Sequence, residues 1–481
     1  MFGYTSIEKY QLDLSQGKTS CEAAVLHYLK QIDQKKHLNA FIQVFGESSL
    51  NKAIELDNSR KAGKKSGNLH GVVIAIKDVI CYKEQPLTAA SHILKDFYSI
   101  YSSTAVERLL AEEAIIIGIC NCDEFAMGST NENSVYGKVL NALDETRVPG
   151  GSSGGSAVAV QAGLCMASLG SDTGGSVRQP ADFCGIVGLK PTYGRISRYG
   201  LIAYASSFDQ IGIFGNNVED VSKILEVISG SDEYDSTVSQ KPVEKYSSLL
   251  NDSHKKFRFA YFKETLDHPS LDNEIAGSIT EFIENLKAKG NEVSALNFEY
   301  LDYIVPAYYI LTTAEASSNL SRYDGVRYGY RSTKPSADLT AFYKHNRSEG
   351  FGKEVKRRIM LGTFVLSTGY YDAYFSKAQK VRRTLVEKTE LVFRDFDFLL
   401  MPTSPTVAFK AGEKTDDPIA MYLADIYTVF ANLTGIPGIS IPLFKHSNGM
   451  PYGIQVMAKQ FEELSLLQAS HELMQLKKYA T

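Results

Sequence analysis

The sequence predicts an α/β fold, and three observations support this class. Short, continuous apolar runs occupy residues 71–76, 114–120 and 164–169, and each has the length of a strand that is buried on both faces. Helix-like or glycine-rich segments separate these runs, as a mixed, largely parallel sheet requires. At 481 residues and 44% hydrophobic composition, the chain can bury a large core. We therefore expect a single large domain, with a mixed and largely parallel β-sheet covered by helices on both faces.

Residues 1–60 are predicted to form a mainly helical region that packs on the core. Residues 19–22, Thr-Ser-Cys-Glu, have the pattern of a capping box that opens a helix. Four apolar side chains follow with helical spacing and are expected on its buried side: Val25, Leu26, Leu29 and Ile32. The chemistry is expected in the remainder, residues 61–481.

The strand predicted at residues 71–76 leads directly into Lys77 and Asp78. Functional side chains often lie at the carboxyl ends of strands in α/β sheets. Burial favours the neutral form of a lysine, and a base that acts near pH 7 needs its pKa lowered from about 10.4 to about 7–8. Lys77 is therefore a candidate general base.

The second half of the chain continues the same alternation after a polar connection. Residues 231–255 are rich in Ser, Asp and Lys and show little periodicity, which predicts a surface connection. A strand is expected at residues 257–262, a helix at 274–288 and another strand at 396–401. We find no internal repeat, so we expect one elaborated domain and not two copies.

Charge and composition disfavour several classes of function. The formal net charge is −4 without a long run of one sign, so the chain lacks the basic surface of a protein that binds nucleic-acid phosphates. No basic segment precedes an apolar run at the start of the sequence, and no apolar stretch approaches membrane-spanning length. We expect a cytoplasmic protein without membrane contact. The six cysteines form no CxxC pair, so we expect buried free thiols and no metal site.

Two serine-bearing glycine loops are the strongest sign of catalysis. Residues 149–156 (Pro-Gly-Gly-Ser-Ser-Gly-Gly-Ser) and residues 171–178 (Ser-Asp-Thr-Gly-Gly-Ser-Val-Arg) flank one helix. Glycines let backbone N–H groups approach a ligand, so such loops can stabilise an oxyanion beside a serine nucleophile. A flexible linker would not alternate with apolar strands, and the Lys-Ser/Thr ending of a P-loop is missing. Acyl transfer is therefore the predicted chemistry.

A serine nucleophile needs a base, and the sequence offers two kinds. Nine histidines lie outside the glycine loops and none occupies a motif of its own, although a Ser-His-Asp triad formed through space stays open. Lys77 is the other candidate, because Ser-Lys pairs are a known variant of the same arrangement.

In Lys77 and the two glycine loops, the chain resembles the amidase signature family, whose catalytic unit is a Ser, cis-Ser, Lys triad. The resemblance implies that Ser176 is the acyl-forming nucleophile and Lys77 the general base. It implies that Ser152, with a cis peptide bond, relays the proton between them. It also implies an oxyanion hole made by the backbone N–H groups of Thr173, Gly174, Gly175 and Ser176.

Within this family, residues 188–212, 315–330 and 369–374 closely resemble the A subunits of the tRNA-dependent amidotransferases, and the resemblance covers nearly the whole chain. It implies a glutaminase that hydrolyses glutamine and supplies ammonia to a partner subunit, which converts Glu-tRNA(Gln) to Gln-tRNA(Gln) with ATP. The implied partners are the B and C subunits of a heterotrimer, and the tRNA binds through a partner. The resemblance implies no cofactor on this chain, with ATP and Mg²⁺ used by the assembled complex.

Recognition of free glutamine needs a cation for its carboxylate and an anion for its ammonium. The resemblance implies that Arg358 and Asp425 have these roles, and that Tyr309 and Met127 line the site. Arg357 is adjacent, so the choice between the two arginines stays open.

One departure from the family pattern affects the turn before the first glycine loop. The family frequently has Asn-Pro-Trp there, whereas this chain has Asn141-Ala142-Leu143 and contains no tryptophan.

Two other functions stay open. One is a free-standing amidase of small aliphatic or aryl amides, which needs no glutamine clamp, and the other is a non-catalytic scaffold of an RNA-modifying complex.

Overall fold

A computed structural model describes residues 3–252, 256–413 and 418–476. In this part of the chain, eleven strands form one sheet in the order β1-β3-β2-β4-β6-β5-β10-β11-β9-β7-β8. The strands are β1 (Phe41–Val44), β2 (Val73–Lys77), β3 (Ile115–Cys120), β4 (Ala167–Ser171), β5 (Val187–Lys190), β6 (Ile211–Gly215), β7 (Arg258–Phe262), β8 (Glu292–Leu296), β9 (Phe398–Pro402), β10 (Gly438–Lys445) and β11 (Pro451–Ala458).

The α-helices of the described residues are α1 (Ile7–Ser15), α2 (Cys21–Gln34), α3 (Gly46–Lys61), α4 (Thr104–Ala111), α5 (Gly154–Gln161), α6 (Arg178–Cys184), α7 (Val218–Ile228), α8 (Tyr246–Leu249), α9 (Lys263–Leu266), α10 (Asn273–Ala288), α11 (Leu301–Asn319), α12 (Leu339–Gly350), α13 (Lys353–Val365), α14 (Lys377–Asp395), α15 (Pro418–Leu423), α16 (Val429–Thr434) and α17 (Glu463–Met474). Short 3₁₀ turns are η1 (Lys36–Leu38), η2 (His92–Leu94), η3 (Glu124–Ala126) and η4 (Leu320–Arg322), and η5 (Asp372–Ser376) is a π-helix.

The predicted α/β class and mixed sheet are confirmed, and the ladders add detail. Strand β2 pairs in parallel with β3 and β4, and β7 pairs in parallel with β8 and β9. The six remaining strand pairs are antiparallel, including the central β5–β10 pair and the β10–β11 hairpin. Parallel pairing is thus confined to two groups of strands on either side of an antiparallel centre.

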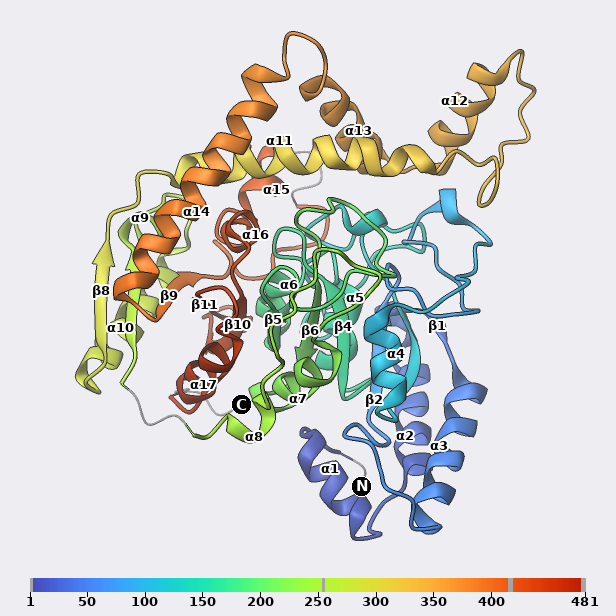
Figure 1. Cartoon of the computed structure of the whole chain (residues 1–481), viewed down its shortest axis with the longest axis vertical. Coiled ribbons are helices and arrows are strands. Elements are labelled where there is room, and N and C mark those ends of the chain that lie inside the picture. The colour runs from blue at the N-terminus through green and yellow to red at the C-terminus, as the bar shows by residue number, and fades with distance from the viewer. Residues whose placement is uncertain (1–2, 253–255, 414–417, 477–481) are drawn as a thin grey trace.

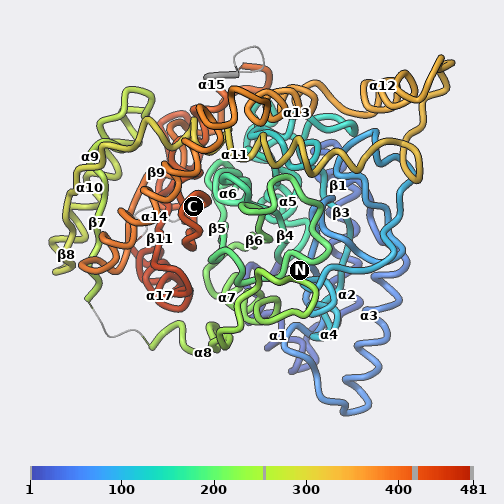
Figure 2. The backbone as a smooth tube through the Cα atoms, turned by 45° about the horizontal axis from the view of Figure 1, so that its top comes forward, coloured from blue at the N-terminus to red at the C-terminus, as the bar shows by residue number. Residues whose placement is uncertain are grey.

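Helices cover both faces of the sheet, and a further layer of long helices lies beyond one edge of it. Helices α5 and α6 contact each other and the sheet, as do α7 and α17. In Figure 1, α11 and α13 cross the top of the molecule, α14 runs down its left side, and α12 projects to the right, as it also does in Figure 2. Among the described helices, none is both long enough and apolar enough to cross a membrane.

Most of the predicted elements are confirmed with small shifts. The runs predicted at residues 71–76, 114–120 and 164–169 correspond to β2, β3 and β4, and the three elements predicted after the connection correspond to β7, α10 and β9. Strand β1 was not predicted, because only four residues form it and they are partly exposed. It pairs with β3 and so joins the N-terminal segment to the main sheet.

Two predictions about the N-terminal helix were wrong. The N-cap of α2 is Ser20 and not Thr19, because the Ser20 side chain accepts from the backbone N–H of Ala23. This places Glu22 one position too early to complete a capping box. Leu26 is 49% exposed, because the buried stripe of α2 passes instead through Cys21, Ala24, Val25, Tyr28 and Ile32.

The connection predicted at residues 231–255 is partly structured, and its residues 253–255 lie outside the described part of the chain. It contains α8, whose Tyr246 is buried. The Tyr246 hydroxyl accepts from Nε of Arg195 at 2.8 Å. All six cysteines are buried and free.

Candidate active site

Lys77 ends strand β2, and its side chain is fully buried. Because β3 and β4 flank β2 in parallel, the loops that follow these three strands meet at one edge of the sheet. The Nζ atom of Lys77 lies 2.7 Å from Oγ of Ser152, 2.9 Å from Oγ of Ser153 and 2.9 Å from Oγ of Ser171. The structure therefore brings the predicted base and the predicted relay residue into direct contact.

Burial lowers the pKa of Lys77 to about 8, although four anionic or ionisable neighbours oppose this effect: Cys122, Asp123, Asp172 and Asp209. Three serine oxygens match the three N–H donors of the protonated amine. Loss of one proton leaves a lone pair that faces hydroxyl groups able to donate to it. The cluster can therefore hold Lys77 in either protonation state.

Ser152 lies in the first glycine loop, immediately before α5. The Gly151–Ser152 peptide bond is cis, as the resemblance implied. The carbonyl oxygen of Ser152 accepts from the backbone N–H of Asp123 at 3.0 Å. A Cβ atom on Gly151 would lie 2.2 Å from Oδ2 of Asp123 and 2.7 Å from the backbone nitrogen of Thr130. This close approach explains why the loop needs glycine at position 151.

The second glycine loop is closed by an ion pair between Asp172 and Arg178, whose side chains are both fully buried and 3.0 Å apart. The Asp172 carboxylate also accepts from the backbone N–H groups of Gly175 at 2.8 Å and Val177 at 3.2 Å. Burial raises the pKa of Asp172, but the adjacent Arg178 guanidinium outweighs this effect, and the pKa falls to about 2. A permanently charged pair therefore fixes the shape of this loop.

Ser176 lies inside this loop and is 8% exposed. Its carbonyl oxygen accepts from the backbone N–H of Ser153 at 3.3 Å, which ties the two glycine loops together. Within the described residues, no hydrogen bond joins the hydroxyls of Ser152 and Ser176. The structure thus brings the three predicted triad residues to adjoining loops, with direct contact for the Lys77–Ser152 pair.

The oxyanion hole predicted from the resemblance would consist of backbone N–H groups in the loop around Ser176. The N–H groups of Thr173 and Gly174 have no acceptor among the described residues, whereas that of Gly175 donates to Asp172. A Cβ atom on Gly174 would lie 2.3 Å from the Tyr308 hydroxyl oxygen. Among the described residues, the N–H groups of Thr173, Gly174 and Ser176 therefore have no acceptor, while the Gly175 donor is engaged within the protein.

Of the two adjacent arginines, Arg358 is the one whose side chain is buried against tyrosine rings. It is 4% exposed, and its Nη1 donates to the Tyr204 hydroxyl at 2.8 Å. Its guanidinium lies over the Tyr309 and Tyr422 rings, 5.4 and 6.0 Å from their centroids. The Arg357 side chain is 33% exposed. Helix α13 therefore turns Arg358 toward these tyrosines and Arg357 away from them.

Asp425 lies at the hydroxyl end of Tyr309. One carboxylate oxygen of Asp425 accepts from the hydroxyls of Tyr309 and Ser129, both at 2.9 Å. Burial raises the pKa of Asp425 to about 6, although these hydrogen bonds oppose the shift. Met127 is fully buried two residues before Ser129. A buried cation and a buried anion thus flank the same tyrosine, as binding of a free amino acid requires.

The site formed by Arg358 and Asp425 adjoins the second glycine loop. The Thr428 hydroxyl lies 2.8 Å from the Gly174 carbonyl oxygen and 3.2 Å from the Asp425 carbonyl oxygen. Asp209 bridges the other side, because it accepts from the Thr173 hydroxyl at 2.6 Å and from the backbone N–H of Tyr204 at 2.9 Å. The second glycine loop and the pair formed by Arg358 and Asp425 are therefore parts of one site.

Glu124 anchors the helix that carries Arg358. Its Oε2 atom accepts from the backbone N–H of Gly352, the N-cap residue of α13, at 2.9 Å. Glu124 begins η3, which ends just before Met127. One short segment therefore positions both the start of α13 and the Met127–Ser129 side of the site.

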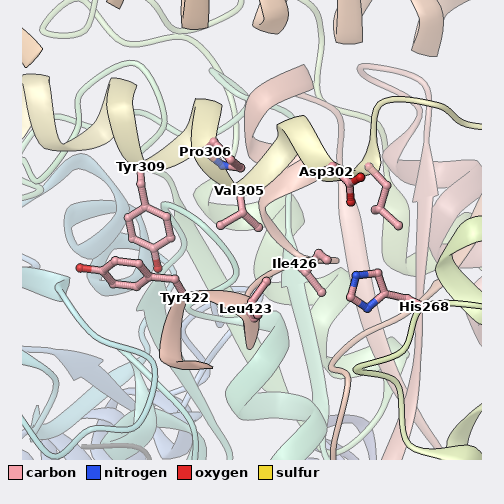
Figure 3. Close-up of a pocket in the computed structure, with 9 residues that line it drawn as sticks. His268, Asp302, Val305, Pro306, Tyr309, Tyr422, Leu423 and Ile426 are labelled. Carbon is pink, nitrogen blue, oxygen red and sulfur yellow. The ribbon is translucent and has the colours of Figure 1, made fainter. Parts of the chain in front are cut away.

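A pocket of about 310 Å³ is lined in part by Tyr309 and Tyr422. Figure 3 shows Tyr309 and Tyr422 at one end of it and His268 and Asp302 at the other. Its lining residues are His268, Leu301, Asp302, Val305, Pro306, Tyr309, Tyr422, Leu423 and Ile426.

Several residues of the site were missed by the sequence analysis. Ser153 and Ser171 belong to the two glycine loops, so their proximity to Lys77 could have been inferred from those loops. Ser129, Tyr204 and Tyr422 occupy no recognisable motif, and only the fold brings them to Arg358 and Asp425. In the described part of the chain, no group of three or more His, Cys, Asp or Glu side chains is arranged to hold a metal ion.

Comparisons with known proteins agree with this geometry. A family model described as Amidase matches residues 23–467. A Chlorobium limicola protein, named as the A subunit of glutamyl-tRNA(Gln) amidotransferase, is 49% identical over 98% of this chain and 99% of its own length. The crystal structure of a Thermotoga maritima protein of the same name is 38% identical, with a TM-score of 0.79 over 96% of this chain and 93% of that one. A peptide amidase from Stenotrophomonas maltophilia is 25% identical, with a TM-score of 0.83 over 100% of this chain and 98% of that one.

Proposed function

The chain belongs to the amidase family, and from this membership we propose that it is the glutaminase subunit of a glutamyl-tRNA(Gln) amidotransferase. One observation carries the proposal. Lys77 is hydrogen-bonded to Ser152, and the second glycine loop leads through Thr428 to a site where buried Arg358 and buried Asp425 both contact Tyr309. Such a site offers acyl-transfer chemistry together with recognition of both charges of free glutamine. The names of the relatives support the same choice of substrate.

In the first step, neutral Lys77 accepts the Ser152 hydroxyl proton while Ser152 takes the proton of Ser176. The freed oxygen of Ser176 forms a bond to the side-chain amide carbon of glutamine. The carbonyl oxygen becomes an oxyanion, and the backbone N–H groups of Thr173 and Gly174 donate to it. Each donor of this kind stabilises the transition state by about 3 kcal/mol.

The tetrahedral intermediate then collapses. The C–N bond breaks, the proton held by Lys77 returns through Ser152 to the leaving nitrogen, and ammonia departs from a glutamyl ester of Ser176. Water attacks this ester with the same base, and glutamate is released. The overall reaction consumes one water molecule and yields glutamate and ammonia.

The substrate clamp uses Arg358 for the glutamine carboxylate and Asp425 for its ammonium, with Tyr309 and Met127 as walls. A free-standing amidase of small aliphatic amides would have no use for this buried pair of charges. A non-catalytic scaffold would have no use for a buried lysine beside Ser152.

In the assembled enzyme, ammonia passes to the B and C subunits of a heterotrimer in the cytoplasm. These subunits bind Glu-tRNA(Gln) and use ATP and Mg²⁺ to activate it. The chain itself needs no cofactor for the proposed hydrolysis, because serine, lysine and backbone donors carry all of its steps.

The test replaces Ser176 by alanine in the assembled complex. Glutamine-dependent formation of Gln-tRNA(Gln) is expected to fall at least 10³-fold, whereas formation with added ammonium salt is retained. Ser48→Ala, at an exposed position on α3, serves as the control and leaves both reactions unchanged. Loss of both reactions in an intact Ser176→Ala complex would contradict the proposed division of labour.

A further inference from the structure

Helix α13 has two faces with opposite character. Its inner face carries Val355, Arg358 and Gly362, all buried, and it packs on α11. Its outer face exposes large apolar side chains, with Met360 at 72% and Phe364 at 42%. The outer face therefore has no partner within the described part of the chain.

This apolar surface continues past the end of α13 into the turn and the π-helix η5. The six residues of the α13 patch are Met360, Leu361, Phe364, Tyr370, Tyr371 and Tyr374, and each is at least 40% exposed. The ring of Phe364 lies 4.4 Å from that of Tyr370 and 5.8 Å from that of Tyr374, centroid to centroid. Monomeric proteins seldom expose contiguous apolar patches of this kind unless the patch binds something.

Lysines flank the α13 patch on both sides. Lys353 and Lys356 precede it on α13, and Lys377 and Lys380 follow it on α14, all of them at least partly exposed. Asp372 is the exposed acidic residue within the patch sequence. The surface therefore has an aromatic centre and a positive rim.

We propose that the α13 patch is the docking site for the ammonia-accepting partner subunit, through a partner surface with an apolar centre and a carboxylate rim. This inference rests on the proposed function. A second copy of this chain is the poorer occupant, because a two-fold contact pairs a surface with itself and would bring the lysine rims together.

The position of the patch suits the transfer of ammonia. Arg358 lies inside the glutamine site on the same helix whose outer face forms the patch. A helix with its side chains is about 10 Å across, so a partner docked here sits within about one helix diameter of the substrate clamp. Figures 1 and 2 show α13 in the outermost layer of helices, where a partner can reach it.

The test measures binding of the purified B and C subunits to the full chain by calorimetry. The variant Met360→Glu/Phe364→Glu is expected to weaken the dissociation constant at least 100-fold, because it places carboxylates in the apolar centre. The matched control is Leu12→Glu/Leu26→Glu, at two positions that are each 49% exposed on α1 and α2, far from α13 in Figure 1. The control is expected to bind as the wild type does.

A second variant tests the rim. Lys353→Glu/Lys356→Glu is expected to slow association about tenfold at low salt, with the difference shrinking as ionic strength rises. Glutamine hydrolysis by each isolated variant, together with its melting temperature, shows that the site and the fold are intact.

The outcomes separate this inference from the proposed function. If the wild type binds both subunits and Met360→Glu/Phe364→Glu binds them equally well, the docking site is wrong while the proposed function stands. If the wild type dimerises and the same variant is monomeric, a second copy occupies the patch, and the inference is overturned. If the wild type neither hydrolyses glutamine nor binds either subunit, the proposed function fails, and the inference fails with it.

Discussion

Lys77 has two competing influences on its charge. Its burial removes the hydration that an ammonium needs, while three serine oxygens at 2.7–2.9 Å replace part of it. Burial lowers its pKa to about 8 against the opposing effect of Cys122 and three aspartates, which leaves about a tenth of the amine neutral at pH 7.

This balance predicts the pH dependence of glutamine hydrolysis. Because only neutral Lys77 can accept a proton, kcat/KM should rise about tenfold from pH 7 and level off above about pH 9. Steady-state assays between about pH 6 and 9.5 measure the profile. Lys77→Arg is the companion variant, and it should be inactive throughout, because a guanidinium stays protonated. A profile that is flat across this range, or turnover by Lys77→Arg, would rule out a lysine base.

The two arginines of α13 should differ sharply in their effect on glutamine. Arg358→Ala is expected to raise KM for glutamine about 100-fold, because a buried charge-assisted contact to the carboxylate is lost. Arg357→Ala, the matched control, should change KM less than threefold. Hydrolysis of a small uncharged amide, such as propionamide, should respond to neither variant. Equal effects of both variants on glutamine would mean that the clamp is assigned to the wrong residue.

Residues in local motifs were predictable from the sequence, and residues brought together by the fold were not. Lys77 follows an apolar strand, and Ser152 and Ser176 stand among glycines, so short stretches identify all three as candidates. The choice between Arg357 and Arg358 needs the rotational phase of α13, which the sequence pattern leaves ambiguous. Ser129 contacts Asp425 across 296 positions of the chain, and no local pattern encodes that contact.

At the scale of elements, the loop of residues 172–178 depends on its own ion pair. Asp172 accepts from two backbone N–H groups of the loop and from Arg178. Arg178 in turn donates to the Thr428 carbonyl at 2.7 Å and to the Gln455 side chain at 2.9 Å. The loop is therefore fixed from both sides.

Arg178→Met should lower the free energy of unfolding by about 3–5 kcal/mol, because it leaves Asp172 as a buried charge without its partner. Urea denaturation at pH 7 measures this change. Arg383→Met serves as the control, since the Arg383–Glu387 pair has side chains 82% and 59% exposed and contributes less than about 1 kcal/mol. A loss below about 1 kcal/mol in Arg178→Met would show that the loop keeps its shape without the pair.

Elements with a clear hydrophobic pattern in the sequence were predictable, and elements without such a pattern were not. Strands β2 and β3 are continuous apolar runs and were predicted to within two residues at each end. Strand β1 has four partly exposed residues without a clear strand pattern, and these residues form a strand because they pair with β3. The start of α2 was misplaced by one residue, because Thr19 and Ser20 are both good N-caps.

At the scale of the whole molecule, two halves of the sequence meet at the centre of one sheet. Strand β5 from the first half pairs with β10 from the second, with Gly438 opposite Lys190. Helix α6 contacts both β10 and β11, so the second half also covers the helix that follows the second glycine loop. The direction of these central strands depends on such distant pairing, and for this reason the antiparallel centre was not predicted.

A chain divided between residues 252 and 253 should show that each half of the sequence depends on the other for its central strand pairing. Each fragment alone would expose a central strand edge and is expected to be insoluble. Co-expression of the two fragments should recover soluble protein with glutaminase activity. Sedimentation and ammonia release measure the two properties. Soluble, folded residues 1–252 on their own would show that the halves are independent domains.

Glu354 reduces the effective positive charge of the proposed glutamine site. It forms ion pairs with both Arg357 and Arg358, so the arginine proposed to bind the substrate carboxylate is already partly neutralised. A bare guanidinium in a buried cleft would attract phosphate or chloride from the surrounding solution. Glu354 discourages these inorganic ions, and a ligand that brings its own ammonium to Asp425 gains what they lack. In the proposed glutamine site, this pairing would favour amino acids over inorganic anions before glutamine binds.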